Sequence, residues 1–246
     1  PGLMLCAGEA RIGPLPQRWW AVCERDRPLR GRTAIGSAGL RSVSPDPSDA
    51  RGGTRLWFRE NGLEVDLALA TQRGPRPIEV VSPSGDQWVW TRKQVGVPAS
   101  GTVSLRGLVR VVGLEASIDD SAGYHERRTR WRWSTGVGRA ESGERIGWNV
   151  VAGIHDGPGA SERTLWVDGE PAELGPVEFA EDLSRVDLPG GGRLDFSQWA
   201  VREHRTNLLV VRSAYRQPFG TFTGELPGGL RLTEGYGVME EHDVRW

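Results

Sequence analysis

The 246-residue chain carries 31 basic and 32 acidic residues, which gives a formal net charge of -1 at pH 7. This balance argues against a general electrostatic attraction to nucleic acid or to anionic lipid. The chain also contains 34 glycines, 16 prolines and 11 tryptophans, a composition typical of many short strands joined by turns. No apolar run is long enough to span a bilayer, and Cys6 and Cys23 lack metal-site or disulfide-framework spacing. We therefore expect a cytoplasmic protein with reduced thiols.

Short apolar or alternating runs, bounded by Gly, Pro, Asn or Asp, recur along the chain and predict an all-β fold. In the first half, strands are expected near 18–24, 54–59, 62–70, 77–82, 86–93 and 102–112. In the second half, they are expected near 129–137, 144–154, 162–168, 175–180, 183–188, 193–196, 199–205, 208–216, 219–226 and 229–238. Four segments that tolerate positive φ predict hairpin turns: Asn61-Gly62, Asp168-Gly169, 189–192 and 227–229.

Three breaker-rich segments interrupt this series. Residues 30–53 form a polar stretch longer than an ordinary hairpin loop, which predicts a mobile loop or a lid over a cavity. Residues 97–101 and 119–123 are further breaks that can separate two halves. We place the boundary near residue 120, which gives an N-terminal half at 1–120 and a C-terminal half at 121–246. Each half is expected to be an antiparallel β-barrel or sandwich.

The segment from 128 to 133 alternates arginine with threonine or tryptophan. On a strand, Trp131 and Trp133 share one face with Thr129, and the arginines share the other. The burial preferences of the two types place the tryptophans in a core or cavity and the arginines in water. The alternative is a single-stranded nucleic-acid site, because tryptophan stacks on bases and arginine binds phosphate. The neutral chain disfavours that alternative, and no nucleic-acid partner is expected.

Asp119 and Asp120 precede His125 within one segment. Adjacent carboxylates can split their pKa values, and histidine exchanges protons near neutral pH. Asp120 and His125 are therefore candidates for proton donor and acceptor, with Tyr124 as an orienting group. The alternative is that an aspartate caps the turn and His125 lies on a barrel rim.

A second candidate region runs from Gly147 to Glu162. On its strand, Trp148 and Val150 share one face, while Asn149 and His155 share the other. Polar groups on an otherwise apolar face can orient a ligand, which makes Asn149 a candidate contact and Glu162 with His155 a second acid-base pair. The alternative is that Asn149 only satisfies a strand or water partner.

Two further positions are candidates for ligand contacts. Lys93 is the only lysine in the chain, and it either balances an anionic head group or survives by chance. Glu240 shares a predicted strand face with His242, and the terminal Trp246 suggests a docked chain end. Local metal-ligand spacings and nucleotide-binding fingerprints are absent, so neither a metal nor a cofactor is expected.

Several motifs, in the same order, resemble those of the family called domain of unknown function 2804. They are the segment 119–125, Trp131-Arg132-Trp133-Ser134, Trp148-Asn149, the segment 161–169 and the segment 239–246. That family is distantly similar to lipocalin-like carotenoid hydratases, tocopherol cyclases and fungal Diels-Alderase-type cyclases. The resemblance implies two lipocalin-like halves around an apolar ligand. It carries over no catalytic residue, because none of those relatives' motifs matches this chain.

These observations lead to a protein that binds a lipophilic small molecule. As an enzyme, it would be a cofactor-independent hydratase, isomerase or cyclase. The alternative is a non-enzymatic lipid or pigment carrier, and a third hypothesis is a carbohydrate-binding β-sandwich. The catalytic candidates are Asp120, His125, Glu162 and His155, and the ligand-binding candidates are Lys93, Tyr124, Trp131, Trp133, Asn149 and Glu240.

Overall fold

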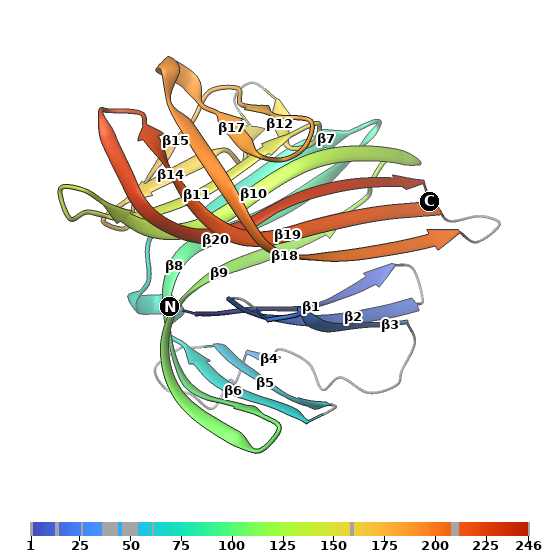
Figure 1. The fold of residues 1–246 in the computed structure, drawn as a ribbon. Coiled ribbons are helices and arrows are strands. Elements are labelled where there is room, and N and C mark those ends of the chain that lie inside the picture. The colour runs from blue at the N-terminus through green and yellow to red at the C-terminus, as the bar shows by residue number, and fades with distance from the viewer. Residues whose placement is uncertain are drawn as a thin grey trace. The chain divides into compact units, whose positions relative to one another are not determined.

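The computed structural model describes residues 2–12, 15–25, 27–35, 44–45, 54–60, 62–157, 160–207 and 212–245. Within these ranges the regular structure consists of strands and two three-residue 3-10 helices, which confirms the predicted all-β class. The chain divides into two compact units (Figure 1). Unit 1 comprises residues 1–74 and 97–116, and unit 2 comprises residues 75–96 and 117–246. The domains 1–120 and 121–246 remain a proposal.

Unit 1 contains a three-stranded antiparallel sheet and part of a six-stranded one. The first sheet is formed by β1 (Leu3–Ile12), β2 (Leu15–Glu24) and β3 (Arg30–Ile35). The second contains β4 (Ser44–Pro45), β5 (Thr54–Glu60) and β6 (Leu63–Leu69), followed by the 3-10 helix η1 (Thr71–Arg73). Trp20 of β2 packs on Phe58 of β5, with 6.4 Å between the ring centroids, and donates a hydrogen bond of 2.9 Å to Glu60.

Strand β1 was not predicted, because its residues are mostly half-buried and lack the period-2 alternation that marks a strand in sequence. The expected long loop at 30–53 is shortened at its start by β3, which pairs with β2. Residues 36–43 and 46–53 lie outside the described residues, and so does most of the proposed lid.

Two long strands contribute to both units. They are β8 (Gln87–Leu105) and β9 (Leu108–Gly123), which pair with each other. The predicted breaks at 97–101 and 119–123 were therefore wrong, because both segments are strand. The single strand expected at 102–112 was also wrong, because Arg106 (φ 53°) and Gly107 (φ 82°) form a turn between β8 and β9. Arginine rarely adopts this left-handed conformation, so its sequence gives no turn signal.

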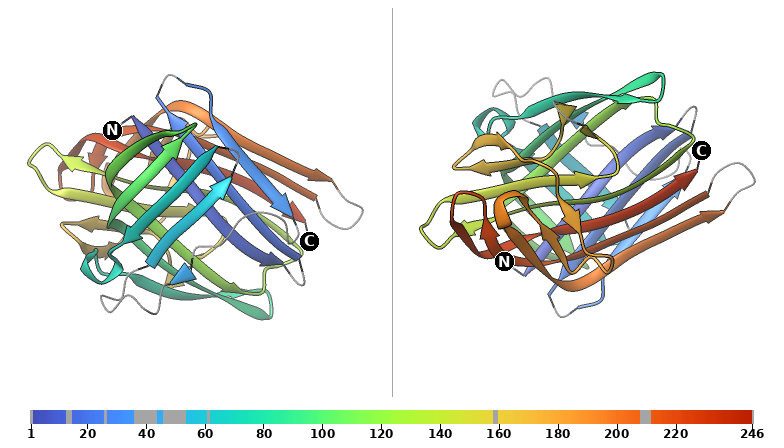
Figure 2. Two further views of the ribbon diagram at one scale, coloured as in Figure 1. Left: turned by 90° about the horizontal axis from the view of Figure 1, so that it is seen from below. Right: turned by 90° about the horizontal axis from the view of Figure 1, so that it is seen from above.

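Unit 2 is built around a nine-stranded antiparallel sheet with the order β15-β14-β11-β10-β20-β19-β18-β17-β16. The strands are β10 (Arg128–Ala140), β11 (Arg145–Ala152), β14 (Thr164–Val167), β15 (Glu170–Glu173), β16 (Glu178–Phe179), β17 (Arg185–Asp187), β18 (Arg193–Asn207), β19 (Arg212–Leu226) and β20 (Leu230–Arg245). The remaining elements are β7 (Ile78–Ser84), β12 (Asp156–Gly157), β13 (Ala160–Ser161) and the 3-10 helix η2 (Pro189–Gly191). The long strands β10, β20, β19 and β18 curve together (Figures 1 and 2).

The predicted turn at Asp168-Gly169 is confirmed, because both residues have positive φ, 49° and 93°. Gly228 and Gly229, at φ 82° and 76°, form the predicted turn between β19 and β20. The 189–192 segment also turns, through η2. Asn61 lies outside the described residues, and its neighbour Gly62 has φ 76°.

The two faces of the nine-stranded sheet differ in chemistry. One face carries the apolar core of unit 2, which includes the fully buried side chains of Trp148, Phe222 and Met239. The opposite face carries Trp133, which is the register partner of Glu240 on β20. This alternation confirms the predicted separation of Trp148 and Val150 from Asn149. The core face stabilises the sheet and leaves the other face available for a site.

Glycines allow Trp148 to lie flat on the sheet. Gly136 is its register partner on β10, and a Cβ at that position would overlap the Trp148 ring and approach the Tyr236 carbonyl oxygen to 2.6 Å. Backbone cannot move away from such a contact without disturbing the β10–β20 pairing. Gly136 is therefore required by close packing.

We expect Gly136→Ala to lower the free energy of unfolding by about 3 kcal/mol, the upper range for overpacking a well-filled core. Gly113→Ala on β9 is the matched control, since nothing lies within 4 Å of its Cβ position. Removing a strand glycine there should leave stability unchanged or slightly raised. Urea unfolding of both variants measures the difference. Equal stabilities would show that the sheet accommodates the methyl group.

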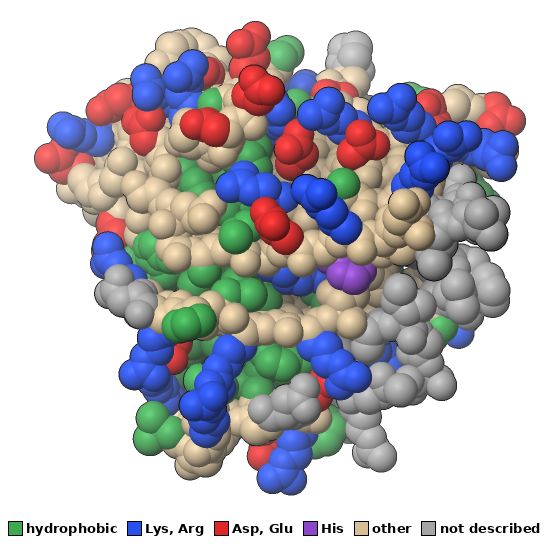
Figure 3. Space-filling view, turned by 45° about the vertical axis from the view of Figure 1, so that its right-hand side comes forward, with side chains coloured by type: hydrophobic (Ala, Val, Ile, Leu, Met, Phe, Trp, Pro, Cys, Tyr) green, Lys and Arg blue, Asp and Glu red, His purple; other side chains and the backbone are tan. Residues whose placement is uncertain are grey.

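Acidic and basic side chains are interspersed on the face drawn in Figure 3, and neither sign dominates it. In the described part of the chain, no helix has the length and apolar character needed to cross a membrane.

Candidate functional site

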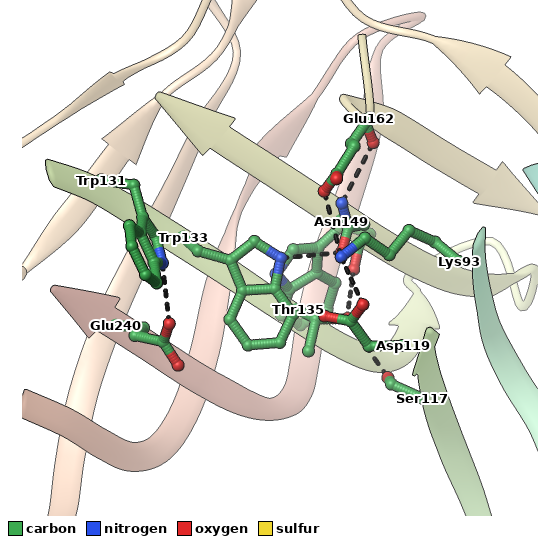
Figure 4. Close-up of polar contacts among 10 residues, drawn as sticks. Lys93, Ser117, Asp119, Trp131, Trp133, Thr135, Asn149, Glu162 and Glu240 are labelled. Atoms are coloured by element: carbon green, nitrogen blue, oxygen red, sulfur yellow. Dashed lines mark hydrogen bonds and ion pairs between the residues drawn. The ribbon is translucent and has the colours of Figure 1, made fainter. Parts of the chain in front are cut away.

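A buried lysine lies at the centre of the candidate site in unit 2. Lys93 of β8 is 5% exposed, and its Nζ lies 2.6 Å from Asp119 Oδ1 and 3.1 Å from Glu162 Oε2 (Figure 4). Burial opposes the charged form, but the two carboxylates, Asp119 foremost, raise the pKa of Lys93 above its ordinary value. The lysine is therefore cationic and joins the two acids.

The β8–β9 pairing explains why Lys93 meets Asp119. The Tyr124 backbone N–H donates to the Trp88 carbonyl oxygen at 3.0 Å. Because the strands are antiparallel, Lys93, five residues after Trp88 on β8, comes opposite Asp119, five residues before Tyr124 on β9. The next residue, Asp120, points to the other face and is exposed.

The two acids differ in accessibility. The Asp119 side chain is 44% exposed, whereas that of Glu162 is 2% exposed. Burial raises the pKa of Glu162, against the opposing effect of Lys93. The Thr91 hydroxyl is near enough to lower that pKa, although neither it nor Glu162 Oε1 forms a hydrogen bond of normal geometry with a described residue. One lysine therefore connects an accessible carboxylate to a buried one.

Asn149 connects this ion cluster to the tryptophan face. Its side-chain oxygen accepts a hydrogen bond of 2.9 Å from Trp133 Nε1, and its amide donates to the Glu162 backbone carbonyl at 3.0 Å. Lys93 Nζ lies 5.8 Å from the centroid of the Trp133 ring. Thr135 contacts both the Ser117 hydroxyl, at 3.2 Å, and the Trp148 carbonyl, at 2.9 Å. The Asn149 bond fixes the orientation of Trp133 beside the lysine.

A second buried carboxyl, Glu240, lies on the same face of the sheet. Its Oε1 accepts from Trp131 Nε1 at 2.9 Å, and its Oε2 accepts from the Tyr215 hydroxyl at 2.8 Å and from Gln217 Nε2 at 3.2 Å. Burial raises the pKa of Glu240, and the Trp131 and Tyr215 hydrogen bonds oppose that effect. Glu240 is thus a carboxyl held by uncharged donors.

Histidines lie beside both carboxyl groups. His155 has its ring centroid 6.0 Å from that of the exposed His125, and burial, followed by the charge of Lys93, lowers its pKa to about 4. His242 packs against Trp131 and Tyr215, and burial lowers its pKa to about 4 as well. Both histidines are therefore neutral at neutral pH.

The structure brings together most of the residues predicted from the sequence. Lys93, Trp131, Trp133, Asn149, Glu162 and Glu240 share this region, and His155 lies close enough to Lys93 for its charge to act. Tyr124, 60% exposed, packs instead on Trp88. Tyr215 and Gln217 were not predicted, nor was Asp119 chosen over Asp120. Among the described residues, no group of three or more His, Cys, Asp or Glu side chains is arranged to hold a metal ion.

Removal of Lys93 alone should strongly destabilise unit 2. We expect Lys93→Met to lower the free energy of unfolding by about 3–5 kcal/mol, because Glu162 is then a buried carboxylate without its cation. The double variant Lys93→Met with Glu162→Leu should recover most of this loss, since no buried charge remains. Urea unfolding of the single and double variants measures the coupling. Additive effects would mean that the two side chains do not interact.

The two histidines with pKa values of about 4 should make unfolding sensitive to acid. A group whose pKa is lowered on folding contributes stability that is present above its ordinary pKa of about 6.5 and is lost as the pH falls through about 4. Each histidine contributes up to about 3 kcal/mol to the free energy of unfolding at neutral pH. Replacing His155 and His242 with glutamine should therefore flatten the pH dependence of the urea midpoint between pH 7 and pH 4. An unchanged slope would contradict their burial as neutral groups.

The fold has solved relatives. Kievitone hydratase from Nectria haematococca is similar with a TM-score of 0.62 and 11% identity, over 97% of this chain and 83% of that chain. A putative AttH from Nitrosomonas europaea is similar with a TM-score of 0.59 and 13% identity, over 97% of this chain and 85% of that chain. At these identities the likeness concerns the fold, and it confirms the predicted lipocalin-like class.

No curated protein matches the chain significantly by sequence. The family model described as domain of unknown function (DUF2804) matches residues 48–246, which is most of the chain. The protein therefore belongs to the DUF2804 family.

Proposed function

We propose that unit 2 binds a lipophilic small molecule and catalyses a cofactor-independent proton transfer on it, as in a hydration, isomerisation or cyclisation. The observation that carries this proposal is the accessible Asp119 carboxylate, fixed at 2.6 Å by a buried lysine. A lysine is costly to bury, and its pairing gives Asp119 a defined position next to an ammonium group that lies 5.8 Å from the centroid of the Trp133 ring. Such positioning suits a general base.

Each residue has a distinct task in this proposal. Trp131 and Trp133 provide aromatic surface for an apolar ligand. Asp119 accepts a proton from the ligand or from a water molecule. Lys93 positions Asp119, and Glu162 anchors Lys93 from the buried side. His155, neutral at physiological pH, is a hydrogen-bonding group at the edge of the ion cluster.

The role first assigned to Asp120 thus passes to Asp119. Asp120 is exposed and points away from Lys93, whereas Asp119 is directly paired with it. His125 keeps its proposed proton-exchange role, because its ring lies beside that of His155. The name of the structural relative kievitone hydratase supports hydration as one of the reactions to test.

A carrier without turnover is the alternative function. Lys93 is already paired with two acids, and Asn149 is bonded to Trp133 and to the Glu162 backbone. A hydrogen-bond and ion-pair network whose partners are all supplied by the protein needs no role beyond stabilising the sheet. Turnover therefore decides between the two functions.

The test begins with native mass spectrometry of the protein from its own host, followed by solvent extraction and identification of the bound molecule. That molecule is then incubated with wild type, Asp119→Asn and Asp120→Asn, and ¹⁸O-labelled water reports any hydration. We expect Asp119→Asn to lower kcat at least about 100-fold, the usual contribution of a general base, and Asp120→Asn to stay close to wild type.

Three other outcomes would change the assigned residue or the proposed function. Loss of turnover in Asp120→Asn, with normal turnover in Asp119→Asn, would return the role to Asp120. Recovery of the molecule unchanged from wild type would favour the carrier. Undiminished turnover in Asp119→Asn would remove Asp119 from the mechanism.

A further inference from the structure

Glu240 differs from Glu162 in the kind of partner that holds it. Glu162 faces a lysine, whereas the hydrogen-bond donors to Glu240 among the described residues are an indole, a phenol and an amide, all uncharged. A cation favours the ionised carboxylate strongly. Uncharged donors leave a buried carboxyl able to hold or release a proton, because neither state leaves a buried ion pair broken.

The bond pattern also identifies the oxygen that carries the proton. Oε2 accepts two hydrogen bonds, from Tyr215 and Gln217, so both of its lone pairs are engaged. Oε1 accepts one bond, from Trp131, and keeps one lone pair free. Oε1, next to the Trp131 indole, is therefore the oxygen with a lone pair available for a proton.

The position of Glu240 connects it with the ion cluster. Its register partner on β10 is Trp133, whose indole bonds Asn149 and lies next to Lys93. The charges of Asp119 and Lys93 both act on Glu240, so the two groups belong to one region of the face. In Figure 4 the Trp133 ring lies between Asp119 and Glu240, and Trp131 lies next to Glu240.

We propose that Glu240 is the proton donor of this site and that it gives the proton on Oε1 to a neutral acceptor of the ligand, such as a carbonyl oxygen or an alkene carbon. The inference rests on the proposed function.

In hydration, Glu240 protonates the alkene carbon, and the Oε1–H electron pair stays on the carboxylate. Water then adds to the other carbon, and Asp119 takes the proton that the water loses. In isomerisation, Asp119 removes a proton from one ligand atom while Glu240 delivers one to another. Proton exchange with solvent then returns Asp119 to its carboxylate form and Glu240 to its protonated form.

The surrounding groups are consistent with this direction of transfer. The titratable or charged groups around Glu240 are Tyr215 on β19, His242 on β20, Arg202 on β18, Lys93 on β8 and Asp119 on β9, and His204 on β18 lies near His242. His242 is neutral, and burial raises the pKa of Glu240. After transfer, the Trp131, Tyr215 and Gln217 donors stabilise the new carboxylate.

The protonation of Glu240 can be measured without a ligand. Infrared difference spectra between wild type and Glu240→Gln, over pH 4 to 9, should show a carboxylic acid C=O band that persists above the ordinary glutamate range and is lost in the variant. Glu241→Gln is the matched control, because Glu241 points to the other face and pairs with Arg130 and Arg132. That variant should keep the band. A wild-type spectrum without a band assignable to Glu240 would overturn the proposal, whatever the outcome for Asp119.

Two further variants keep the test valid where Glu240→Gln does not fold. Tyr215→Phe and Trp131→Phe each remove one donor to the carboxylate, so each should move the titration of the band to higher pH. An unmoved titration in both variants would contradict the assignment.

Turnover of the extracted molecule separates this inference from the proposed function. With Glu240 as acid, Glu240→Gln should lower kcat by about 100-fold or more with KM little changed, because the variant keeps the shape but has no acidic proton. Loss in Asp119→Asn with normal turnover in Glu240→Gln would overturn only the role of Glu240. Normal turnover in both would overturn both proposals.

Discussion

The buried ammonium group of Lys93 is the constraint on which the rest of unit 2 depends. Bringing a lysine from water to a position that is 5% exposed costs several kcal/mol unless opposite charges surround it. Asp119 and Glu162 supply those charges from β9 and from the segment before β14, so the ion cluster ties three separate parts of the chain together. One consequence is positional precision. A carboxylate held at 2.6 Å by a lysine that is itself anchored cannot adopt the many rotamers of a free surface aspartate.

The sheet determines where such a cluster can lie. Alternation along β10 and β11 places Trp148 and Val150 in the apolar core and Trp133 and Asn149 on the opposite face. Gly136 lets Trp148 approach the backbone closely, which keeps the core dense beneath the polar face. Apart from Glu162, which lies in the segment before β14, the residues of the ion cluster and of the tryptophan face lie on paired strands, and strands hold side chains in fixed register. Preorganisation of this kind is what proton transfer between positioned groups requires.

The sequence was sufficient for properties that depend on local pattern. Period-2 alternation and turn residues predicted most strands and the separation of Trp133 from the arginines, and the motif order indicated the family. The sequence did not single out Asp119 as the partner of Lys93, for a physical reason. Residues 119–123 contain small and acidic residues typical of a turn, so no strand parity was assigned to them, and the sheet pairing that overrides this preference is non-local. Tyr215 and Gln217 were missed because their contact with Glu240 depends on β19 pairing with β20. No local pattern contains that information.

Glu162 and Glu240 are two buried carboxyl groups of one region that differ in their partners. Both are buried, and burial raises the pKa of each. The difference lies in what happens when the proton leaves. For Glu162, the resulting charge is shared with Lys93, so its ionised form is part of the structural network. For Glu240, the hydrogen-bond donors that receive the charge, among the described residues, are uncharged: an indole, a phenol and an amide. Dipoles that are already aligned need no rearrangement when charge appears, which is the condition under which a buried acid can release and recover a proton repeatedly without loosening the fold around it.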